Sequence, residues 1–308
     1  MTMTAEQIER EHRKDLERLK QFRLLDDDFM KKVFDGNPLY IQIVLRIVLN
    51  MPELTVIHVE TEFFVENLLN RSVRLDVVAT DGGGRTFNVE IQRADDGADP
   101  RRARYHSSML DAFIVKKGTK FYDLPETWVI FITERDIFKE GRPLYQIERT
   151  IRGGGMDFND GAHILYVNGE YRADDDLGRL MHDFSCTNPD DMYDETLAER
   201  VRFFKESRKG VEIMCRVLEE MRDEYIQIGI QQGVQQGIQQ GVQQGIQQGI
   251  QQGVQQGIQQ GVKQGEKNGE NRRSREVALR MLKAGKYAAD EIAEVSGLSL
   301  DVVQELRA

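Results

Sequence analysis

The stretch RLDVVATDGGGRTFNVEIQR, residues 74–93, predicts two apolar strands joined by a turn of three glycines. Polar side chains interrupt these strands at Asp76, Glu90 and Gln92. Strands that are otherwise apolar belong in a sheet interior, where an acid needs a partner. The stretch therefore predicts both the centre of the fold and a candidate site.

Side chains alternate between the two faces of a strand. The second strand is thereby divided into a polar face with Asn88, Glu90 and Gln92 and an apolar face with Phe87, Val89 and Ile91. On the first strand we expect Leu75 and Val77 on one face, and Asp76 and Val78 on the other.

The turn determines which residues of the two strands lie opposite one another. If Asp81 and Arg85 pair around the three glycines, as in a common hairpin loop, Asp76 falls opposite Glu90. A slip of one residue would place Asp76 opposite Val89 and send the two carboxylates to opposite faces. In the favoured register their Cβ atoms lie roughly 5 Å apart.

Two carboxylates this close repel each other or share a proton unless a cation lies between them. Oxygen ligands completed by water suit Mg²⁺, with Mn²⁺ as an alternative. Such an ion can hold a phosphate oxygen and lower the pKa of a bound water. Pairing alone leaves a second interpretation open, an exposed hairpin face on which the acids and the amide meet only water.

The order of motifs along the chain resembles a known nuclease family. Asp on one strand, Glu-x-Gln on the next and a basic helix after them are similar to the PD-(D/E)XK nuclease fold, and more closely to its recombination-promoting nuclease/transposase family. The similar segments are DDDFMKKVF (26–34), LLNRSVRLDVVATD (68–81), FNVEIQ (87–92), PRRARYHSSM (100–109), KKGTKFYDLPETWVIFI (116–132) and the end of the chain.

This resemblance implies an α/β fold with a restriction-endonuclease-like core, a central mixed sheet flanked by helices. It implies that Asp76 and Glu90 hold the metal and that Gln92 stands where the fold usually has Lys. The family commonly has Gln there, and an amide would orient water or phosphate by hydrogen bonding. The first acid of the fold is Asp28 or Glu66, unless these residues only cap a helix or lie at the surface.

The segment 99–118 predicts a helix that ends at Gly118. Against one acid, Asp111, residues 101–120 carry six basic side chains: Arg101, Arg102, Arg104, Lys116, Lys117 and Lys120. A basic strip beside an acidic metal site suits a DNA backbone. The resemblance covers Arg102 and Tyr105. We expect Arg102, with Arg101 and Arg104 of the basic strip, to bind DNA, while core packing is the favoured role for Tyr105. We expect His106 to be structural.

Further elements follow from periodicity and turn residues. Strands are expected at 55–64, 127–134 and 161–169, and helices at 5–25, at 194–221 and, in two pieces broken near Gly36-Asn37-Pro38, at 26–50. This order predicts a mostly antiparallel meander with a crossover.

The chain is expected to divide into a nuclease-like domain (1–225), a repeat (226–269) and a C-terminal helical hairpin (270–308). The repeat contains eight perfect IQQG or VQQG units. Ten glycines would each cost a helix roughly 1 kcal/mol, which favours a marginal helix or a disordered spacer unless the repeat self-associates. The hairpin resembles part of a helix-turn-helix, with Ser299 as an N-cap, but it is acidic, which disfavours reading a DNA groove.

Composition limits the remaining possibilities. The net charge of −10 disfavours non-specific coating of nucleic acid, and no apolar run is long enough for a membrane span. Cys186 and Cys215 suggest reduced thiols in a cytoplasmic protein. Together with the facing acids, the resemblance implies a Mg²⁺-dependent DNA endonuclease that acts in recombination or transposition. The alternative is a catalytically silent nuclease fold that assembles through its repeat, as a homo-oligomer, and its C-terminal helices.

Overall fold

The structure is a computed structural model that describes residues 5–66, 72–93, 95–115 and 118–307. The chain folds into two compact units, Met1–Asp223 and Glu224–Ala308. Among the described residues, no helix combines the length and the apolar character that a membrane crossing requires. The domain boundaries at residues 226 and 270 remain predictions.

A six-stranded sheet forms the centre of the first unit, in the order β1-β2-β3-β4-β8-β5. The first three strands form an antiparallel meander, β4 and β8 continue parallel to β3, and β5 is antiparallel to β8. The strands are β1 (Val56–Val65), β2 (Val73–Asp81), β3 (Thr86–Gln92), β4 (Thr127–Thr133), β5 (Leu144–Ile147) and β8 (Ala162–Asn168). The sheet is mixed, as predicted, and the three further strands expected from the sequence are confirmed.

The sequence did not predict β5 or the small hairpin of β6 (Thr150–Ile151) and β7 (Met156–Asp157). Their side chains are exposed or half-buried. They therefore lack the apolar runs that marked the central strands.

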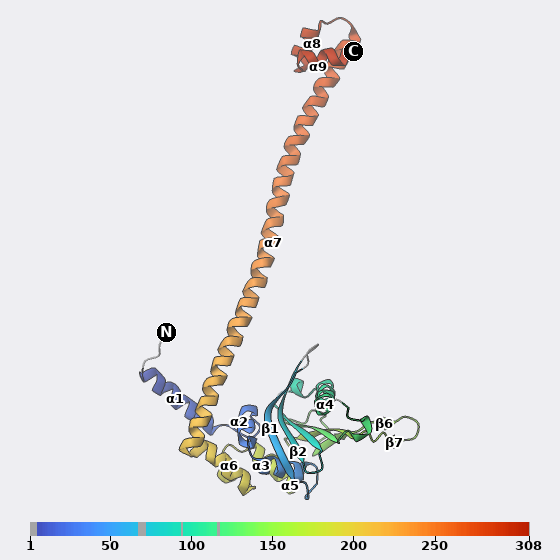
Figure 1. Cartoon of the computed structure of the whole chain (residues 1–308). Coiled ribbons are helices and arrows are strands. Elements are labelled where there is room, and N and C mark those ends of the chain that lie inside the picture. Colours follow the sequence, from blue (N-terminus) through green and yellow to red (C-terminus); the bar gives the residue numbers. More distant parts are fainter. Residues whose placement is uncertain (1–4, 67–71, 94, 116–117, 308) are drawn as a thin grey trace. The chain divides into compact units, whose positions relative to one another are not determined.

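Helices cover both faces of the sheet (Figure 1). The helices of this unit are α1 (Ala5–Lys20), α2 (Asp27–Phe34), α3 (Pro38–Val48), α4 (Pro100–Ile114), α5 (Asp176–Ser185), α6 (Glu195–Glu206) and the first turns of α7 (Arg208–Ala284), with the short 3-10 helices η1 (Asp95–Ala98), η2 (Phe121–Asp123) and η3 (Pro189–Asp191). Since α4 connects β3 to the parallel strand β4, it serves as the crossover.

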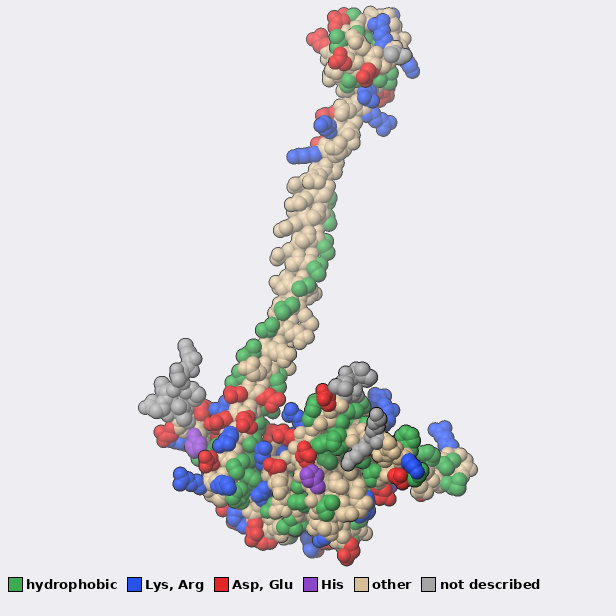
Figure 2. All heavy atoms as spheres, viewed as in Figure 1, with side chains coloured by type: hydrophobic (Ala, Val, Ile, Leu, Met, Phe, Trp, Pro, Cys, Tyr) green, Lys and Arg blue, Asp and Glu red, His purple; other side chains and the backbone are tan. Residues whose placement is uncertain are grey.

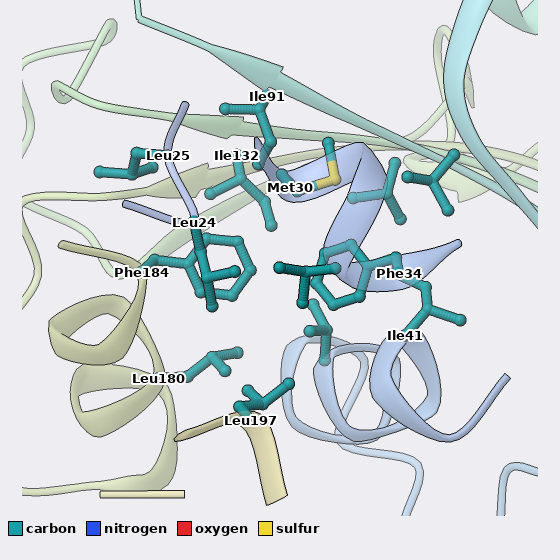
Figure 3. Packing of buried hydrophobic residues seen from close by; sticks show 14 of the residues in the cluster. Leu24, Leu25, Met30, Phe34, Ile41, Ile91, Ile132, Leu180, Phe184 and Leu197 are labelled. Atoms are coloured by element: carbon teal, nitrogen blue, oxygen red, sulfur yellow. The ribbon is translucent and has the colours of Figure 1, made fainter. Parts of the chain in front are cut away.

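Two apolar clusters hold these layers together. The larger one joins α2, α3, α5 and α6 to one face of the sheet, and Figure 3 shows Phe34, Phe184 and Ile132 within it. The smaller one joins Leu110 of α4 to Phe131 and other side chains on the opposite face. The predicted apolar face of β3, with Phe87, Val89 and Ile91, packs in the larger cluster.

Three helix boundaries test the sequence signals. The predicted break before α3 is confirmed, and the Asn37 side chain accepts the Leu39 N–H at 3.0 Å. The prediction that α4 ends at Gly118 was wrong, because the helix ends at Ile114. Val115 caps it, and the Val115 N–H makes the last helical hydrogen bond, to the Asp111 carbonyl. The helix predicted at 194–221 is two helices, which separate at Ser207.

The hairpin register is confirmed. Asp81 N–H donates to the Arg85 carbonyl at 3.1 Å, and Val77 lies opposite Val89. The Asp81 carboxylate also accepts the Arg85 side chain at 2.7 Å, which fixes the turn. Gly84, at φ +86°, supplies the left-handed residue that such a loop needs.

The prediction that Leu75 and Val77 of β2 lie on the same face of the sheet was wrong. Val77 packs in the larger cluster, whereas Leu75 packs with Val78 in the smaller one. Glu62 lies across from this point on β1 and has φ +56°, which a regular strand does not allow. The side chains of β2 before and after Asp76 therefore follow different alternations, so that Leu75 and Val77 lie on opposite faces of the sheet.

The second unit is built on the remainder of α7, and it contains the whole repeat. The repeat was expected to be a marginal helix or a spacer, and the structure forms it as continuous helix. Its Ile and Val side chains are exposed and follow an oblique line along the helix (Figure 2). A small cluster of Ala278, Ile292 and Val303 joins the end of α7 to α8 (Ala289–Ser296) and α9 (Leu300–Arg307).

The start of α9 is the boundary of the C-terminal helices that the sequence predicted. Gly297 closes α8 at φ +70°, and α9 starts at Leu300, directly after the predicted N-cap Ser299.

Candidate active site

Asp76 and Glu90 lie where β2 and β3 stop pairing. The last backbone pair is Val77 with Val89. Beyond it, Asp76 N–H donates to Glu90 Oε1 at 3.2 Å, and Ile91 N–H donates to Asp76 Oδ2 at 3.2 Å. Each carboxylate therefore satisfies a backbone N–H of the neighbouring strand, and the structure brings the predicted pair together.

Both acids are buried. Asp76 is 7% exposed and Glu90 is fully buried. Burial raises the pKa of Asp76 well above its usual range, and the negative charges of Glu90 and Asp27 raise it further. A positive charge beside this pair would relieve the repulsion between the carboxylates.

One cation already lies beside Asp76, and the sequence analysis missed it. Lys31 of α2 places Nζ 3.5 Å from Asp76 Oδ1 and 2.7 Å from Asp27 Oδ2. Burial lowers the pKa of Lys31, but the charges of Asp76 and Asp27 outweigh burial and raise it. Burial also raises the pKa of Asp27, against the opposing hydrogen bond from Lys31.

A signal for this contact exists in the sequence of α2. Lys31 occupies a buried position among Met30, Val33 and Phe34, where a lysine requires a partner. Asp27 precedes it by four residues, the spacing of neighbours on a helix face. A lysine on the apolar face of a helix therefore indicates an acid to be found in the fold.

The other end of the pair is held by α4 and by β3 itself. Asn88 Nδ2 donates to Glu90 Oε1 at 3.0 Å. His106 Nδ1 lies 3.3 Å from the same oxygen, and the Arg102 guanidinium lies 3.7 Å from Glu90 Oε2. Arg102 Nε donates to His106 Nε2 at 3.3 Å, so the two side chains of α4 also contact each other.

Three buried oxygens of the site have no hydrogen-bond partner among the described residues: Glu90 Oε2, Asn88 Oδ1 and Asp27 Oδ1. Buried oxygens nearly always have a hydrogen-bond partner, so these three atoms are candidates for binding a ligand. Hard oxygens from two acids and an amide fit a divalent cation such as Mg²⁺. Of the two ligands that the sequence predicted, Glu90 contributes one of these oxygens, whereas Asp76 Oδ2 accepts the Ile91 N–H and Asp76 Oδ1 lies 3.5 Å from Lys31 Nζ.

Gln92 is half-buried at the end of β3. A Cβ added to Gly97 would lie 1.9 Å from Gln92 Oε1, so the amide packs directly against the backbone of η1. The side chain shares the polar face of β3 with Glu90, as predicted.

Neither predicted candidate for the first acid has a described contact with the pair. Glu66 is exposed just beyond the end of β1, and Asp28 is half-buried on α2. Asp27, one residue earlier, is the acid that contacts Lys31. One residue on a helix is a rotation of about 100°, which separates the directions of Asp27 and Asp28.

The basic residues of α4 differ in their surroundings. Arg101 and Arg104 are exposed, whereas Arg102 reaches Glu90. Tyr105 is half-buried and packs against the smaller apolar cluster, which supports the core role. Lys120 is exposed, and Lys116 and Lys117 lie outside the described residues.

A separate group of ligand-type side chains lies on α5 and after it. Ligand atoms of His182, Asp183 and Cys186 lie within 4.8 Å of one another. However, the Asp183 carboxylate accepts the N–H groups of Tyr193 and Asp194 at 2.7 and 2.9 Å. Burial raises the pKa of Cys186 to about 11. The cluster therefore fixes the loop before α6.

Comparison with known proteins gives one match. A family model described as PD-(D/E)XK nuclease family transposase matches residues 31–169. The matched range starts at Lys31, includes Asp76, Glu90 and Gln92, and extends through β8. No curated protein and no solved structure matches the chain.

Proposed function

We propose, from the match of residues 31–169 to PD-(D/E)XK nuclease family transposases, that the chain is a metal-dependent DNA endonuclease of recombination or transposition. The family supports a nuclease- or transposase-like role and confirms the resemblance seen in the sequence. The observation that supports the finer proposal is the buried, facing pair of Asp76 and Glu90.

Asp76 and Glu90 are the proposed metal ligands. Asn88, which donates to Glu90, and Asp27, which accepts from Lys31, each have a further buried oxygen with no hydrogen-bond partner among the described residues. Nucleases of this superfamily typically use divalent metals, and Mg²⁺ or Mn²⁺ fits this oxygen donor set. When bound, such an ion supplies Lewis-acid polarisation of a phosphate oxygen and a more acidic water.

The residues of the chain orient this site. Asn88 donates to Glu90 Oε1 and His106 Nδ1 lies 3.3 Å from the same oxygen, whereas Glu90 Oε2 has no hydrogen-bond partner among the described residues. Arg102 is 42% exposed and lies within 3.7 Å of Glu90, so its guanidinium can contact both the site and a phosphate. Gln92 presents an uncharged amide on the same strand face.

DNA is the proposed substrate. Arg101 and Arg104 are exposed on α4, and Arg102 lies between the surface and Glu90. The carboxylates of the site repel the phosphate backbone of DNA. Arginines at the surface around the site attract it. Binding is therefore expected to weaken steeply as salt is raised.

The silent-fold alternative is favoured by one observation, the exposed Ile and Val side chains of the repeat. Exposed apolar residues in regular succession fit association with another copy of the chain. In that case the protein would assemble without cutting DNA.

Cleavage by the full-length chain tests the proposal. Wild type should nick or linearise a supercoiled plasmid with Mg²⁺ or Mn²⁺ and leave it intact with EDTA. Asp76→Asn and Glu90→Gln should lower the rate more than about 100-fold. Both substitutions retain an oxygen that can accept the N–H of Ile91 or Asp76, so the fold is preserved.

Glu60→Gln is the matched control, because Glu60 is an exposed acid on β1. It should cut at the wild-type rate. The proposal fails if wild type shows no metal-dependent cleavage, or if the Asp76 and Glu90 variants cut as fast as wild type.

A further inference from the structure

Without Lys31, the candidate site has a deficit of positive charge, because Arg102 brings one positive charge against three carboxyl groups. Asp27, Asp76 and Glu90 contribute three carboxyl groups, and a phosphodiester would add another negative charge. Negative charge grows further on the phosphate as the reaction proceeds, and positive groups fixed in advance stabilise it. The motif position two residues after Glu90 holds Gln92, which is neutral.

Lys31 is placed to fill this deficit. Its side chain is 8% exposed, and its ammonium lies against Asp76 Oδ1 and Asp27 Oδ2. An ammonium has three N–H donors, so two acid contacts leave one for a further acceptor. Because the group is buried, its charge acts through a lower dielectric than that of a surface lysine.

The lysine is also held in position before any substrate arrives. Asp27 lies four residues earlier on α2 and bonds to Nζ at 2.7 Å. Asp27 is 44% exposed, so it lies at the solvent side of the contact, with Asp76 on the inner side. This anchoring removes the freedom that a long side chain would otherwise lose on binding.

We propose that Lys31, from α2, is the catalytic cation of this nuclease and supplies the positive charge that Gln92 lacks on β3. This inference rests on the proposed function and assigns the residue that acts on the scissile phosphate. Lys31 is expected to donate to a non-bridging oxygen of that phosphate.

The step itself is hydrolysis. A water oxygen forms a bond to phosphorus, and the bond from phosphorus to the leaving ester oxygen breaks with its electron pair on that oxygen. One proton of the water is released to solvent, and the leaving oxygen takes one proton. Lys31 keeps its protons and neutralises the added negative charge, so nothing is oxidised or reduced.

The test uses kinetics of the full-length chain at saturating Mg²⁺. Lys31→Met keeps the length of the side chain and removes the charge. We expect kcat to fall about 100-fold while KM for DNA changes less than about 3-fold. Lys32→Met, the adjacent half-buried lysine of α2, should retain wild-type kinetics.

The decisive variant moves the positive charge from α2 to β3. Lys31→Met combined with Gln92→Lys should recover at least about 10-fold of the lost kcat, because the charge returns to the same site from β3. Thermal unfolding without DNA gives a second readout. Mg²⁺ should stabilise the Lys31→Met variant as much as it stabilises wild type, since Asp76 and Glu90 remain.

Three outcomes overturn the inference. One is Lys31→Met cutting at the wild-type rate while Asp76→Asn is inactive, which leaves the proposed function standing. Another is a loss of stabilisation by Mg²⁺ in Lys31→Met, which would show that Lys31 holds the ligands. The third is an absence of recovery in the double variant. If wild type itself does not cleave, the proposed function fails first.

Discussion

The two compact units place their side chains in opposite ways. The first buries Asp76, Glu90 and His106 and matches each with partners from distant parts of the chain. The second exposes Ile and Val along a repeat that has no charged residue from Ile226 to Val262. Order therefore comes from tertiary contacts in the first unit and from helical hydrogen bonds between near neighbours in the repeat.

The same substitution in both units should give the largest contrast. Ile130→Ala, at a fully buried position of β4, should lower the free energy of unfolding by about 2–5 kcal/mol. Ile246→Ala, at a position 58% exposed, should change it by no more than about 0.5 kcal/mol. Denaturant titrations would measure both effects, with the fluorescence of Trp128, the sole tryptophan of the chain, for Ile130→Ala and far-ultraviolet circular dichroism for Ile246→Ala.

The contrast would break if Ile246→Ala removed helical signal at a much lower denaturant concentration than wild type. That result would show that the repeat side chains are packed in solution. A dependence of the same transition on protein concentration would then identify another copy of the chain as the partner.

Glycines in the two units should respond with opposite sign. A Cβ on Gly178 would lie 2.0 Å from the Ala173 carbonyl oxygen, so Gly178→Ala should destabilise the first unit by about 1–3 kcal/mol. A Cβ on Gly245 meets no described atom within 4 Å, so Gly245→Ala should stabilise the helix by about 1 kcal/mol. The Trp128 transition reports the first variant, and helical circular dichroism reports the second.

Loss of stability by Gly245→Ala would contradict this prediction. It would indicate that another helix approaches the repeat closely at the glycines.

Buried charge makes the stability of the first unit depend on pH. The pKa of Asp76 is raised in the folded state, so the folded chain binds more protons than the unfolded chain at intermediate pH. Without metal, the free energy of unfolding should fall as pH rises from the unfolded pKa of about 3.9 through the folded pKa. Denaturant midpoints of the Trp128 transition, measured over this range in EDTA, would check this.

Asp76→Asn supplies the control, because its side chain does not titrate. Its stability should fall less with pH than that of wild type over the same window. An equal slope in both proteins would show that Asp76 is not responsible for the dependence.

Local chemistry made much of the fold predictable. The Asp81 and Arg85 pair around the glycine turn was sufficient to place Asp76 opposite Glu90. Asn37 and Pro38 located the start of α3, and the apolar composition of β4 placed it in the sheet centre. These features depend on residues close together in sequence.

Other features depended on contacts that no local pattern contains. Lys31 and Asp76 are far apart in sequence, and only packing of α2 on the sheet brings them within 3.5 Å. The rotation of β1 at Glu62 arises without a glycine, so the change of face at Asp76 had no marker. The short exposed strands β6 and β7 had no apolar pattern at all.

The hydrogen bonds that end the β2–β3 pairing have a spectroscopic consequence. The amide protons of Asp76 and Ile91 are bonded to the carboxylates of Glu90 and Asp76, which are the proposed ligands. Any ion or proton that binds these oxygens withdraws electron density from both bonds. The two backbone resonances should therefore shift when the site fills, so that occupancy could be followed by magnetic resonance in the absence of DNA.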